Sequence, residues 1–395
     1  MKKTFLLLIT ILMVLSAKAQ SFDELAQTPP MGWNSWNCFG CNINEKQIKE
    51  VVDLIVSTGM RDAGYEYVNI DDCWQIGRDK DGVIVVDKKT FPSGIKALAD
   101  YIHSKGLKFG VYSCAGSLTC AGRPGSRGYQ FVDALTYAKW GVDYLKYDWC
   151  YDEGQTPKAA YKTMSDALKA CGRPIVFSIC EWGNSEPWKW AKGIGHLWRT
   201  TGDIINSFDG VDQYGGCGVV GIIDKNVDLA KYSGPGHWND PDMLQIGNGV
   251  LTPVENRTHL SMWAMLAAPL LAGNDLRKMD KETLDILTNN EVIAVDQDKL
   301  GKQGVRYMKV GDHETWTREL SNGEGAVCFF NRGTTPWTFK MNWARQINFG
   351  KVITWQKEFN IRDLWAHKNI GTTDKEMEFT VPAHGVVLLR LSPKK

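Results

Sequence analysis

The heptapeptide YLKYDWC at positions 144–150 carries two charged residues inside an otherwise apolar and aromatic run. Its pattern predicts a β-strand, and strand alternation places Tyr144, Lys146 and Asp148 on one face. A strand in a parallel sheet is buried on both faces, and burying either charge alone costs free energy. The segment therefore predicts either a buried ion pair that only fixes the register of the strand or one wall of a polar pocket.

Acidic residues recur at the ends of other short, β-prone segments. They are Asp71, Asp72, Glu181, Asp203 and Asp242. Taken singly, each is more typical of a turn or a helix cap. Together with Lys146, Arg199, Tyr112 and several Trp residues, they predict a polar pocket with aromatic walls. No phosphate-binding loop or metal-ligand triad accompanies them in the sequence. Such a pocket suits a neutral, polyhydroxylated ligand.

Two carboxylates in a pocket of sugar size are the minimum needed for glycoside hydrolysis. Asp148 is the better candidate nucleophile, because Lys146 next to it on the strand favours the ionised form. Asp203 then suits the acid/base role, because a neighbouring anion would raise its pKa and a Thr-Gly turn places it at the rim. Periodicity alone neither separates these two roles nor excludes Glu181.

The elements that must position these residues alternate between strand-like and helix-like segments over residues 30–303. We expect strands at 65–70, 108–113, 144–147, 174–179 and 197–201, and helices at 93–105, 129–139 and 157–170. Ser93 is the expected N-cap of the first of these helices, and Gly106 is its stop signal. This alternation predicts an α/β fold with a parallel sheet.

Two parallel architectures compete, an open doubly wound sheet and a closed (β/α)8 TIM barrel. An open sheet focuses ligands at its switch point, and no Gly-rich dinucleotide fingerprint follows the first strand. A barrel instead brings the C-terminal ends of all its strands to one face, where active sites lie. Because polar residues stand at one strand end after another, the sequence favours a barrel over residues 20–303.

Residues 304–395 have a different pattern. Short β-branched or aromatic segments at 325–330, 337–341, 351–355 and 378–391 are separated by Gly, Asn and Pro turns. They predict an appended antiparallel β-sandwich domain. Trp337, Trp343, Trp355 and Trp365 in this region predict either core packing or a sugar-binding platform.

Composition excludes several classes of function. The 395 residues include 46 Lys+Arg and 45 Asp+Glu, and this near-neutral balance argues against a nucleic-acid partner. The hydrophobic share of 43% and the charged share of 23% are ordinary globular values and exclude wholesale disorder. The 16 Trp residues are unusually many, and the flat indole ring suits the apolar faces of sugars.

Residues 1–19 have the layout of a cleaved secretory signal. Lys2 and Lys3 precede an apolar run, and Ala17-Lys18-Ala19 offers a cleavage site before Gln20. No later segment is apolar enough to predict a membrane span. We therefore expect an exported protein, periplasmic or secreted, in which disulfides are possible. The spacing of the ten Cys residues does not predict a metal site, and no cofactor is expected.

Six motifs together resemble those of glycoside hydrolase family 27, the α-galactosidase family. They are PPMGWNSW at 29–36, NIDDCW at 69–74, LKYD at 145–148, CEW at 180–182, WRTTGDI at 198–204 and GHWNDPDML at 236–244. They occur in the family's order from about residue 29 to the C-terminus. The resemblance implies a (β/α)8 barrel with a C-terminal β-sandwich, and hydrolysis with retention of anomeric configuration.

Carried over by position, the resemblance assigns roles to individual residues. Asp148 resembles the nucleophile and Asp203 the acid/base. The residues that resemble substrate contacts or pocket walls are Trp36, Asp71, Asp72, Tyr112, Lys146, Cys180, Glu181, Trp182, Arg199, Asp242 and Met243. The family's disulfides would join Cys41 to Cys73 and Cys120 to Cys150. The implied partner is a galactose-containing oligo- or polysaccharide.

The implied activity is that of a retaining, exo-acting α-galactosidase, with three alternatives. Within the family, the substrate could be an N-acetyl-α-galactosaminide or a β-L-arabinopyranoside; the bulk of Glu181 and Trp182 disfavours the first, and the presence of both Asp71 and Asp72 disfavours the second. The third alternative is a catalytically silent sugar-binding protein. The 207–228 segment departs from the family pattern and could remodel the leaving-group side. Its Cys217 could pair with Cys114 or Cys180, or stay free.

Overall fold

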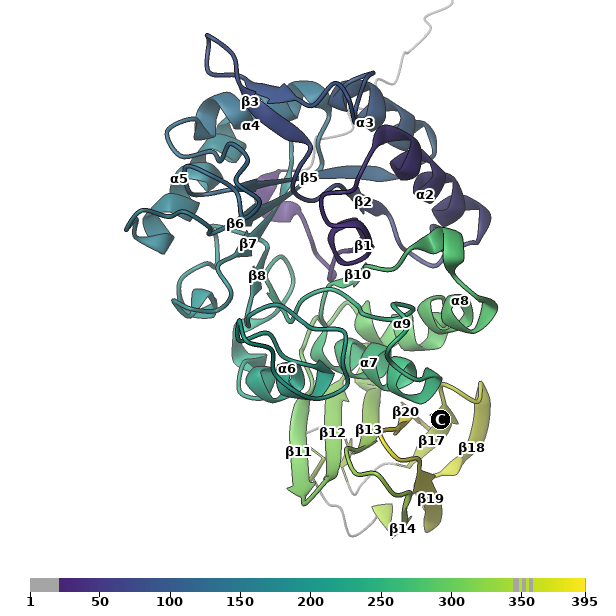
Figure 1. The fold of residues 1–395 in the computed structure, drawn as a ribbon. Coiled ribbons are helices and arrows are strands. Elements are labelled where there is room, and N and C mark those ends of the chain that lie inside the picture. Colours follow the sequence, from purple (N-terminus) through teal and green to yellow (C-terminus); the bar gives the residue numbers. More distant parts are fainter. Residues whose placement is uncertain (1–20, 344–347, 350–352, 355–357, 395) are drawn as a thin grey trace, which may run out of the picture.

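The computed structural model describes residues 21–394, apart from 344–347, 350–352 and 355–357. The expected signal segment and Trp355 lie outside the described residues. The described chain forms a parallel barrel followed by an antiparallel β-domain, which confirms the fold class expected from the sequence (Figure 1).

Eight parallel strands form the barrel. In chain order they are β1 (Met31–Asn34), β2 (Tyr67–Asn69), β5 (Lys108–Cys114), β6 (Tyr144–Asp148), β7 (Val176–Cys180), β8 (Leu197–Arg199), β9 (Trp238–Asp240) and β10 (Leu270–Ala272). The sheet order is β10-β1-β2-β5-β6-β7-β8-β9. A parallel bridge between Leu244, just after β9, and Ala272 of β10 joins the two edges. All strand C-termini therefore open on one face of a closed ring. A hairpin of β3 (Gln75–Arg78) and β4 (Ile84–Val86) is inserted after β2.

Helices surround the strands and cover the outer face of the barrel (Figure 1). They are α2 (Glu45–Ser57), α3 (Ile95–Ser104), α4 (Gln130–Trp140), α5 (Pro157–Ala170), α6 (Val219–Asn226), α7 (Pro253–Leu266), α8 (Lys281–Leu287) and α9 (Asn290–Asp296), with a short α1 (Trp36–Phe39) directly after β1. Between β7 and β8 the described chain has only the 3-10 turn Pro187–Lys189. The expected N-cap Ser93 is wrong: Gly94 caps α3 without a side-chain hydrogen bond, and Ser93 N instead donates to Glu45 Oε2.

Large side chains close the N-terminal end of the barrel. Tyr67, Tyr144, Val176, Leu197 and Trp238, each at or near the start of its strand, form one buried cluster. Barrel interiors are packed cores rather than pores, so this layer leaves only the opposite end of the ring open to a ligand. The site must therefore lie at the C-terminal strand ends.

The C-terminal domain is built on a six-stranded antiparallel sheet, order β11-β12-β13-β20-β17-β18. Its strands are β11 (Val305–Val310), β12 (His313–Glu319), β13 (Gly325–Asn331), β17 (Phe359–Asp363), β18 (Lys368–Thr372) and β20 (Val386–Pro393), with smaller pairs β14 (Trp337–Met341) with β19 (Met377–Val381) and β15 (Asn348–Phe349) with β16 (Ile353–Thr354). The expected strand at 378–391 is two strands, because Pro382 cannot donate to a ladder and the chain turns there. Trp343 packs in the core of this domain.

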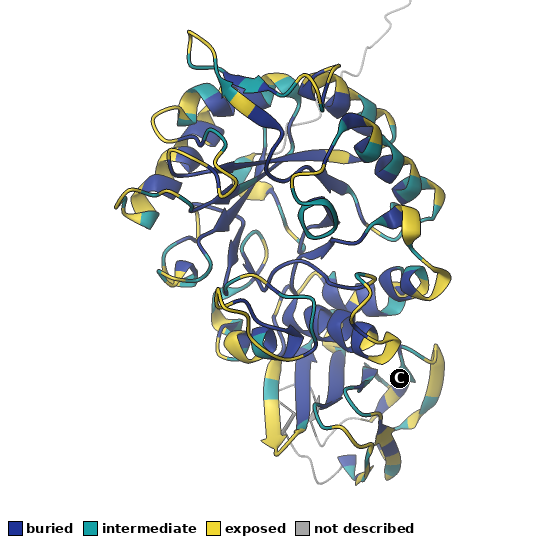
Figure 2. Cartoon of the chain, in the orientation of Figure 1, coloured by how far each residue is buried: buried dark blue, intermediate teal, exposed yellow. Residues whose placement is uncertain are grey.

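Helix α7 connects the two domains. It contacts β12, β13 and β20 of the large sheet as well as α8 and α9 of the barrel. Most of its residues are buried, as the dark ribbon in Figure 2 shows. A helix that is buried on all sides belongs to a core, so α7 makes the barrel and the sheet one packed unit.

The structure contains both disulfides that the resemblance implied, Cys41–Cys73 and Cys120–Cys150. The other six cysteines are free thiols, including Cys217, which pairs with neither Cys114 nor Cys180. In the described part of the chain, no helix is long and apolar enough to cross a bilayer.

Candidate active site

A cavity of about 270 Å³ lies at the C-terminal ends of the barrel strands. It is lined by Trp36, Asn37, Asp71, Asp72, Tyr112, Cys120, Lys146, Asp148, Trp182, Arg199, Asp203, Ile204, Ile205, Asp212, Asp242 and Met243. Eleven of the thirteen predicted catalytic and substrate-contact residues are in this set. The strand-end pattern in the sequence therefore identified one real cavity rather than separate turn residues.

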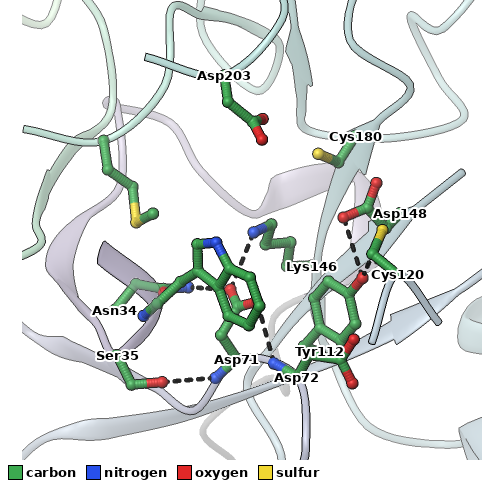
Figure 3. Close-up of polar contacts among 12 residues, drawn as sticks. Asn34, Ser35, Asp71, Asp72, Tyr112, Cys120, Lys146, Asp148, Cys180 and Asp203 are labelled. Atoms are coloured by element: carbon green, nitrogen blue, oxygen red, sulfur yellow. Dashed lines mark hydrogen bonds and ion pairs between the residues drawn. The ribbon is translucent and has the colours of Figure 1, made fainter. Parts of the chain in front are cut away.

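The floor of the cavity contains a buried ion pair between Lys146 and Asp71. Lys146 Nζ lies 2.9 Å from Asp71 Oδ2, and Asn34 Nδ2 donates to the same oxygen at 2.8 Å. The Lys146 side chain is only 17% exposed. Figure 3 shows the Ser35 hydroxyl accepting from the backbone amide of Asp71, which fixes the main chain at this residue. Lys146 Nζ has further donor capacity, because an ammonium carries three protons.

Asp72 is held by the backbone. Its Oδ1 accepts from Cys73 N at 2.7 Å and its Oδ2 from Ala121 N at 2.9 Å. Burial nevertheless raises the pKa of Asp72, more than these amides lower it. The disulfide at Cys73 secures the adjacent turn, so both oxygens of Asp72 present a fixed hydrogen-bonding edge to the cavity.

Asp148 lies at the end of β6 with both oxygens occupied. Oδ1 accepts from Trp149 N at 2.9 Å, and Oδ2 accepts from the Tyr112 hydroxyl at 3.0 Å (Figure 3). Burial raises the pKa of Asp148 to about 6, although the Lys146 charge acts to lower it. The carboxylate is thus oriented by two donors and loses its proton just below neutral pH.

Arg199 joins two carboxylates on the opposite side of the cavity. Its Nη2 lies 3.0 Å from Asp203 Oδ1 and 2.9 Å from Asp242 Oδ2. Asp242 is buried, whereas the Asp203 side chain is 66% exposed at the rim. A carboxyl group in that position can exchange protons with solvent while it faces the cavity.

The electrostatic expectation for the two catalytic candidates was wrong in direction. The sequence led us to expect a low pKa for Asp148 and a raised one for Asp203. Burial outweighs Lys146 at Asp148, and at Asp203 the effect of partial burial is outweighed by the Arg199 and Lys146 charges, which bring its pKa below the usual value. The pKa order in the free protein therefore does not support the reasoning from charge by which the two roles were predicted.

Two predicted site residues lie outside the cavity lining. Cys180 lies beneath it, with Sγ 3.7 Å from Arg199 Nη1. Glu181 is fully buried, and its Oε2 accepts from Ser185 N at 2.7 Å in the following turn. The bulk of Trp182, but not that of Glu181, thus restricts the cavity. Trp33, also at a strand end, donates to Asn274 O in the core.

Four lining residues were not predicted: Asn37, Ile204, Ile205 and Asp212. Cys120, a fifth, was predicted only as a disulfide partner. Asn37 and Ile204 follow predicted residues closely and could have been found by proximity. Asp212 had no such signal, because it lies outside the six motifs on which the resemblance depends.

Backbone conformation also marks the site. Trp182 (φ 58°), Asp242 (φ 83°) and Cys73 (φ 79°) all lie in the left-handed region. Non-glycine residues rarely adopt it, and such conformations cluster at functional sites where the surroundings enforce them. Here they change the direction of the chain after β7, β9 and β2, three strands whose C-terminal ends contribute residues to the pocket.

One group of possible metal ligands touches the site among the described residues, Cys120, Asp148 and Cys150. The two sulfurs are joined in a disulfide, so neither is the thiolate that a metal requires. The carboxylates of the cavity instead hydrogen-bond to amides, Arg and Lys, which suits binding and acid/base chemistry on a hydroxyl-rich molecule.

A barrel that presents two carboxylates, Asp148 and Asp203, in one closed-ended polar pocket with aromatic walls is typical of glycoside hydrolases. Family models agree: residues 28–298 match "Alpha galactosidase A", and residues 310–391 match "Alpha galactosidase C-terminal beta sandwich domain". The chain belongs to glycoside hydrolase family 27, the α-galactosidase family.

Individual relatives cover 93–100% of this chain. The α-galactosidase A of Cellvibrio japonicus is 52% identical over 100% of both chains. The crystal structure of α-galactosidase I from Mortierella vinacea is 40% identical, with a TM-score of 0.89 over 93% of this chain and 98% of that one. A β-L-arabinopyranosidase of the family from Geobacillus stearothermophilus is 26% identical, with a TM-score of 0.83 over 96% of this chain and 100% of that one.

Proposed function

We propose that this protein is a retaining α-galactosidase that removes terminal α-linked galactose from oligo- or polysaccharides. The observation that carries the proposal is that Asp148 and Asp203 line one cavity of about 270 Å³ together with the Asp71–Lys146 pair. The relatives described as α-galactosidases support the choice of sugar. We expect the Asp148 and Asp203 carboxyl groups to act about 5–5.5 Å apart, the spacing of retaining enzymes.

In the proposed reaction, an Asp148 oxygen attacks the anomeric carbon as the bond to the leaving oxygen breaks. Asp203 gives its proton to that oxygen, and a galactosyl ester on Asp148 remains. Water then attacks the same carbon, its proton passes to Asp203, and the ester bond breaks. Asp203 thus regains its proton at the end of each turnover, and its exposed position also lets it exchange protons with solvent.

Hydroxyl recognition follows from the fixed groups on the floor and wall. We assign Asp71 and Asp72 to the 4-OH and 6-OH, Lys146 to neighbouring ring hydroxyls, and Arg199 and Asp242 to the 2-OH side. Trp36, Tyr112, Trp182 and Met243 form apolar walls. The contacts among these groups support the assignment. Each of the five polar residues already has a hydrogen bond or ion pair to another group before the sugar binds, so little side-chain entropy is lost on binding.

Product stereochemistry tests the proposal directly. NMR of the first products from p-nitrophenyl α-galactoside is expected to show α-galactose before mutarotation; initial β-galactose would contradict double displacement.

The rates of release of p-nitrophenol from the α-galactoside, the N-acetyl-α-galactosaminide and the β-L-arabinopyranoside test the choice of sugar. We expect the last two to react more slowly, because Trp182 leaves little space for an acetamide and a pentose lacks the 6-OH that the Asp71–Asp72 pair accepts. Galactose binding without any turnover would favour the silent sugar-binding protein.

The pH profile should follow the ionisation of Asp148. With 2,4-dinitrophenyl α-galactoside, whose leaving group needs no proton from Asp203, the Asp148 pKa of about 6 means that kcat/KM falls below that pH, because the protonated carboxyl cannot attack. The Lys146 charge lowers this pKa, so Lys146→Met is expected to move the acid limb to higher pH, besides reducing the maximum rate. Lys146→Arg keeps the charge and should leave the limb in place. A limb that stays fixed in Lys146→Met would show that another group controls it.

We also propose that the protein is exported. The sequence of residues 1–19 and the two disulfides support this, because disulfides persist in oxidising compartments. N-terminal sequencing of protein recovered outside the cytoplasm is expected to begin at Gln20, and recovery of the intact Met1 terminus would contradict it.

A further inference from the structure

Two larger hollows adjoin the cavity on different sides. One, of about 640 Å³, shares Trp182, Asp203 and Asp212 with it and extends to Tyr214 and Gly216. The other, of about 770 Å³, shares Trp36 and Asn37 and extends to Lys278. Either could receive whatever is attached to the galactose, so the position of the proton donor must decide between them.

The leaving oxygen must lie against Asp203, because this residue is assigned to protonate it. Asp203 lines the first hollow but not the second. The group that departs with that oxygen therefore extends past Asp203 into the hollow bounded by Trp182 and Tyr214, which we call the Tyr214 hollow.

The outer wall of the Tyr214 hollow is the 209–216 loop, which lies between β8 and α6. Asp212 Oδ1 accepts from both Tyr214 N and Gly216 N at 2.8 Å. Cys217 N donates to Asp203 O at 3.1 Å, and Ile205 N donates to Cys217 O at 2.9 Å. The loop is thus a compact turn bonded to the segment that carries Asp203, so its backbone has a fixed place relative to the acid/base.

The side chains on this wall suit a sugar. Tyr214 is 86% exposed, an unusual placement for a large aromatic side chain. Asp212 Oδ2 accepts no hydrogen bond from the described residues, while Oδ1 is fully used. On the inner side, Trp182 and Gly183 line the hollow, and Gly183 (φ 78°) packs so closely on Thr200 O that a Cβ there would lie 2.3 Å from it.

We propose that the 209–216 loop forms the leaving-group subsite, where the Tyr214 ring stacks on the sugar to which galactose is attached and Asp212 accepts a hydrogen bond from that sugar. This inference rests on the proposed function and narrows the substrate class to galactosides whose leaving group is itself a sugar.

The same subsite would bind acceptors. After the first leaving group departs, a sugar in the Tyr214 hollow can replace water: its hydroxyl oxygen bonds to the anomeric carbon, the ester bond to Asp148 breaks, and the hydroxyl proton passes to Asp203. Transfer to a sugar should therefore depend on Tyr214 more than hydrolysis does.

Paired substrates test the proposal. Melibiose carries glucose as leaving group, and α-galactosyl fluoride carries only a small anion that leaves the hollow empty. Tyr214→Ala is expected to lower kcat/KM for melibiose about tenfold and to change that for α-galactosyl fluoride by less than about twofold. Tyr214→Phe, which keeps the ring, should retain most of the melibiose activity. Tyr214→Ala should also lower the ratio of transfer to hydrolysis when glucose is added.

Lys278→Ala, in the other hollow, is the matched control and should alter neither substrate selectively. An equal loss on both substrates in Tyr214→Ala would show a merely structural loop, and a selective loss of melibiose activity in Lys278→Ala would place the leaving group in the other hollow; either result overturns the subsite. If the unmodified protein cleaves neither substrate, the proposed function itself fails, which is a distinct outcome.

Discussion

Replacing Asp148 by alanine is expected to lower kcat for α-galactosides by on the order of 10⁴-fold or more, since the covalent route is lost altogether. Without the carboxylate, no ester can form at the anomeric carbon. The Asp71–Lys146 pair and the Arg199 contacts do not involve Asp148, so galactose should still bind. Turnover of p-nitrophenyl α-galactoside and galactose binding by calorimetry measure the two effects separately.

Azide identifies the position of the missing nucleophile. In the Asp148→Ala protein a small anion can enter the vacated space and attack the same face of the sugar. Azide should then restore turnover and give β-galactosyl azide, the inverted product. Formation of the α anomer, or wild-type turnover without azide, would remove Asp148 from this role.

The raised pKa of Asp148 should also affect the free energy of unfolding, which can be measured without any assay of activity. Because the folded-state pKa of Asp148 is about 6 and the ordinary value is 3.8, the folded protein binds more protons between these pH values. Ionisation of Asp148 therefore costs stability that grows as pH rises through this window and stays lost above it. Asp148→Asn should stabilise the protein at pH 7 by roughly 1–3 kcal/mol, and the gain should vanish below about pH 4. Urea unfolding at the two pH values measures this.

The sequence predicted the barrel well because its signals are local and repeated. The helix at 157–170 matches α5 at both ends, where Pro157 occupies the first turn. Strand alternation correctly placed Lys146 and Asp148 on the pocket side and Leu145 and Tyr147 in the surrounding core. A parallel barrel buries both faces of a strand, so two charged side chains on one face of such a strand indicate a polar pocket.

What the sequence did not predict depends on the balance of burial against charge and on loop conformation. Lys146 is adjacent to Asp148 on the strand face, but its closest carboxylate contact is Asp71, a residue 75 positions away. Glu181 is next to the strand end, yet its carboxylate turns to Ser185 N because Trp182 adopts φ 58°. Neither long-range pairing nor a left-handed turn at Trp has a periodic signature in the sequence.

The second large effect is expected at Asp203. Asp203→Ala should lower kcat for melibiose by about 10²–10⁴-fold, because the glucose oxygen departs only when protonated. With 2,4-dinitrophenyl α-galactoside, whose leaving group needs no proton, formation of the galactosyl ester should stay fast and its hydrolysis should become limiting. A burst of dinitrophenol in stopped-flow kinetics is the expected sign. A loss that is equal for both leaving groups would show that Asp203 is not the acid.

Azide distinguishes this variant from the first. In Asp203→Ala the ester on Asp148 still forms, so azide attacks it from the side that water uses, and the product should be α-galactosyl azide. Asp228→Ala, an exposed acid after α6 that lines neither the cavity nor the Tyr214 hollow, is the matched control and should not respond to azide. Opposite anomers from the two variants would place the two carboxylates on opposite faces of one sugar, because each azide product records the face that its missing carboxylate served. The same anomer from both would exclude the double displacement.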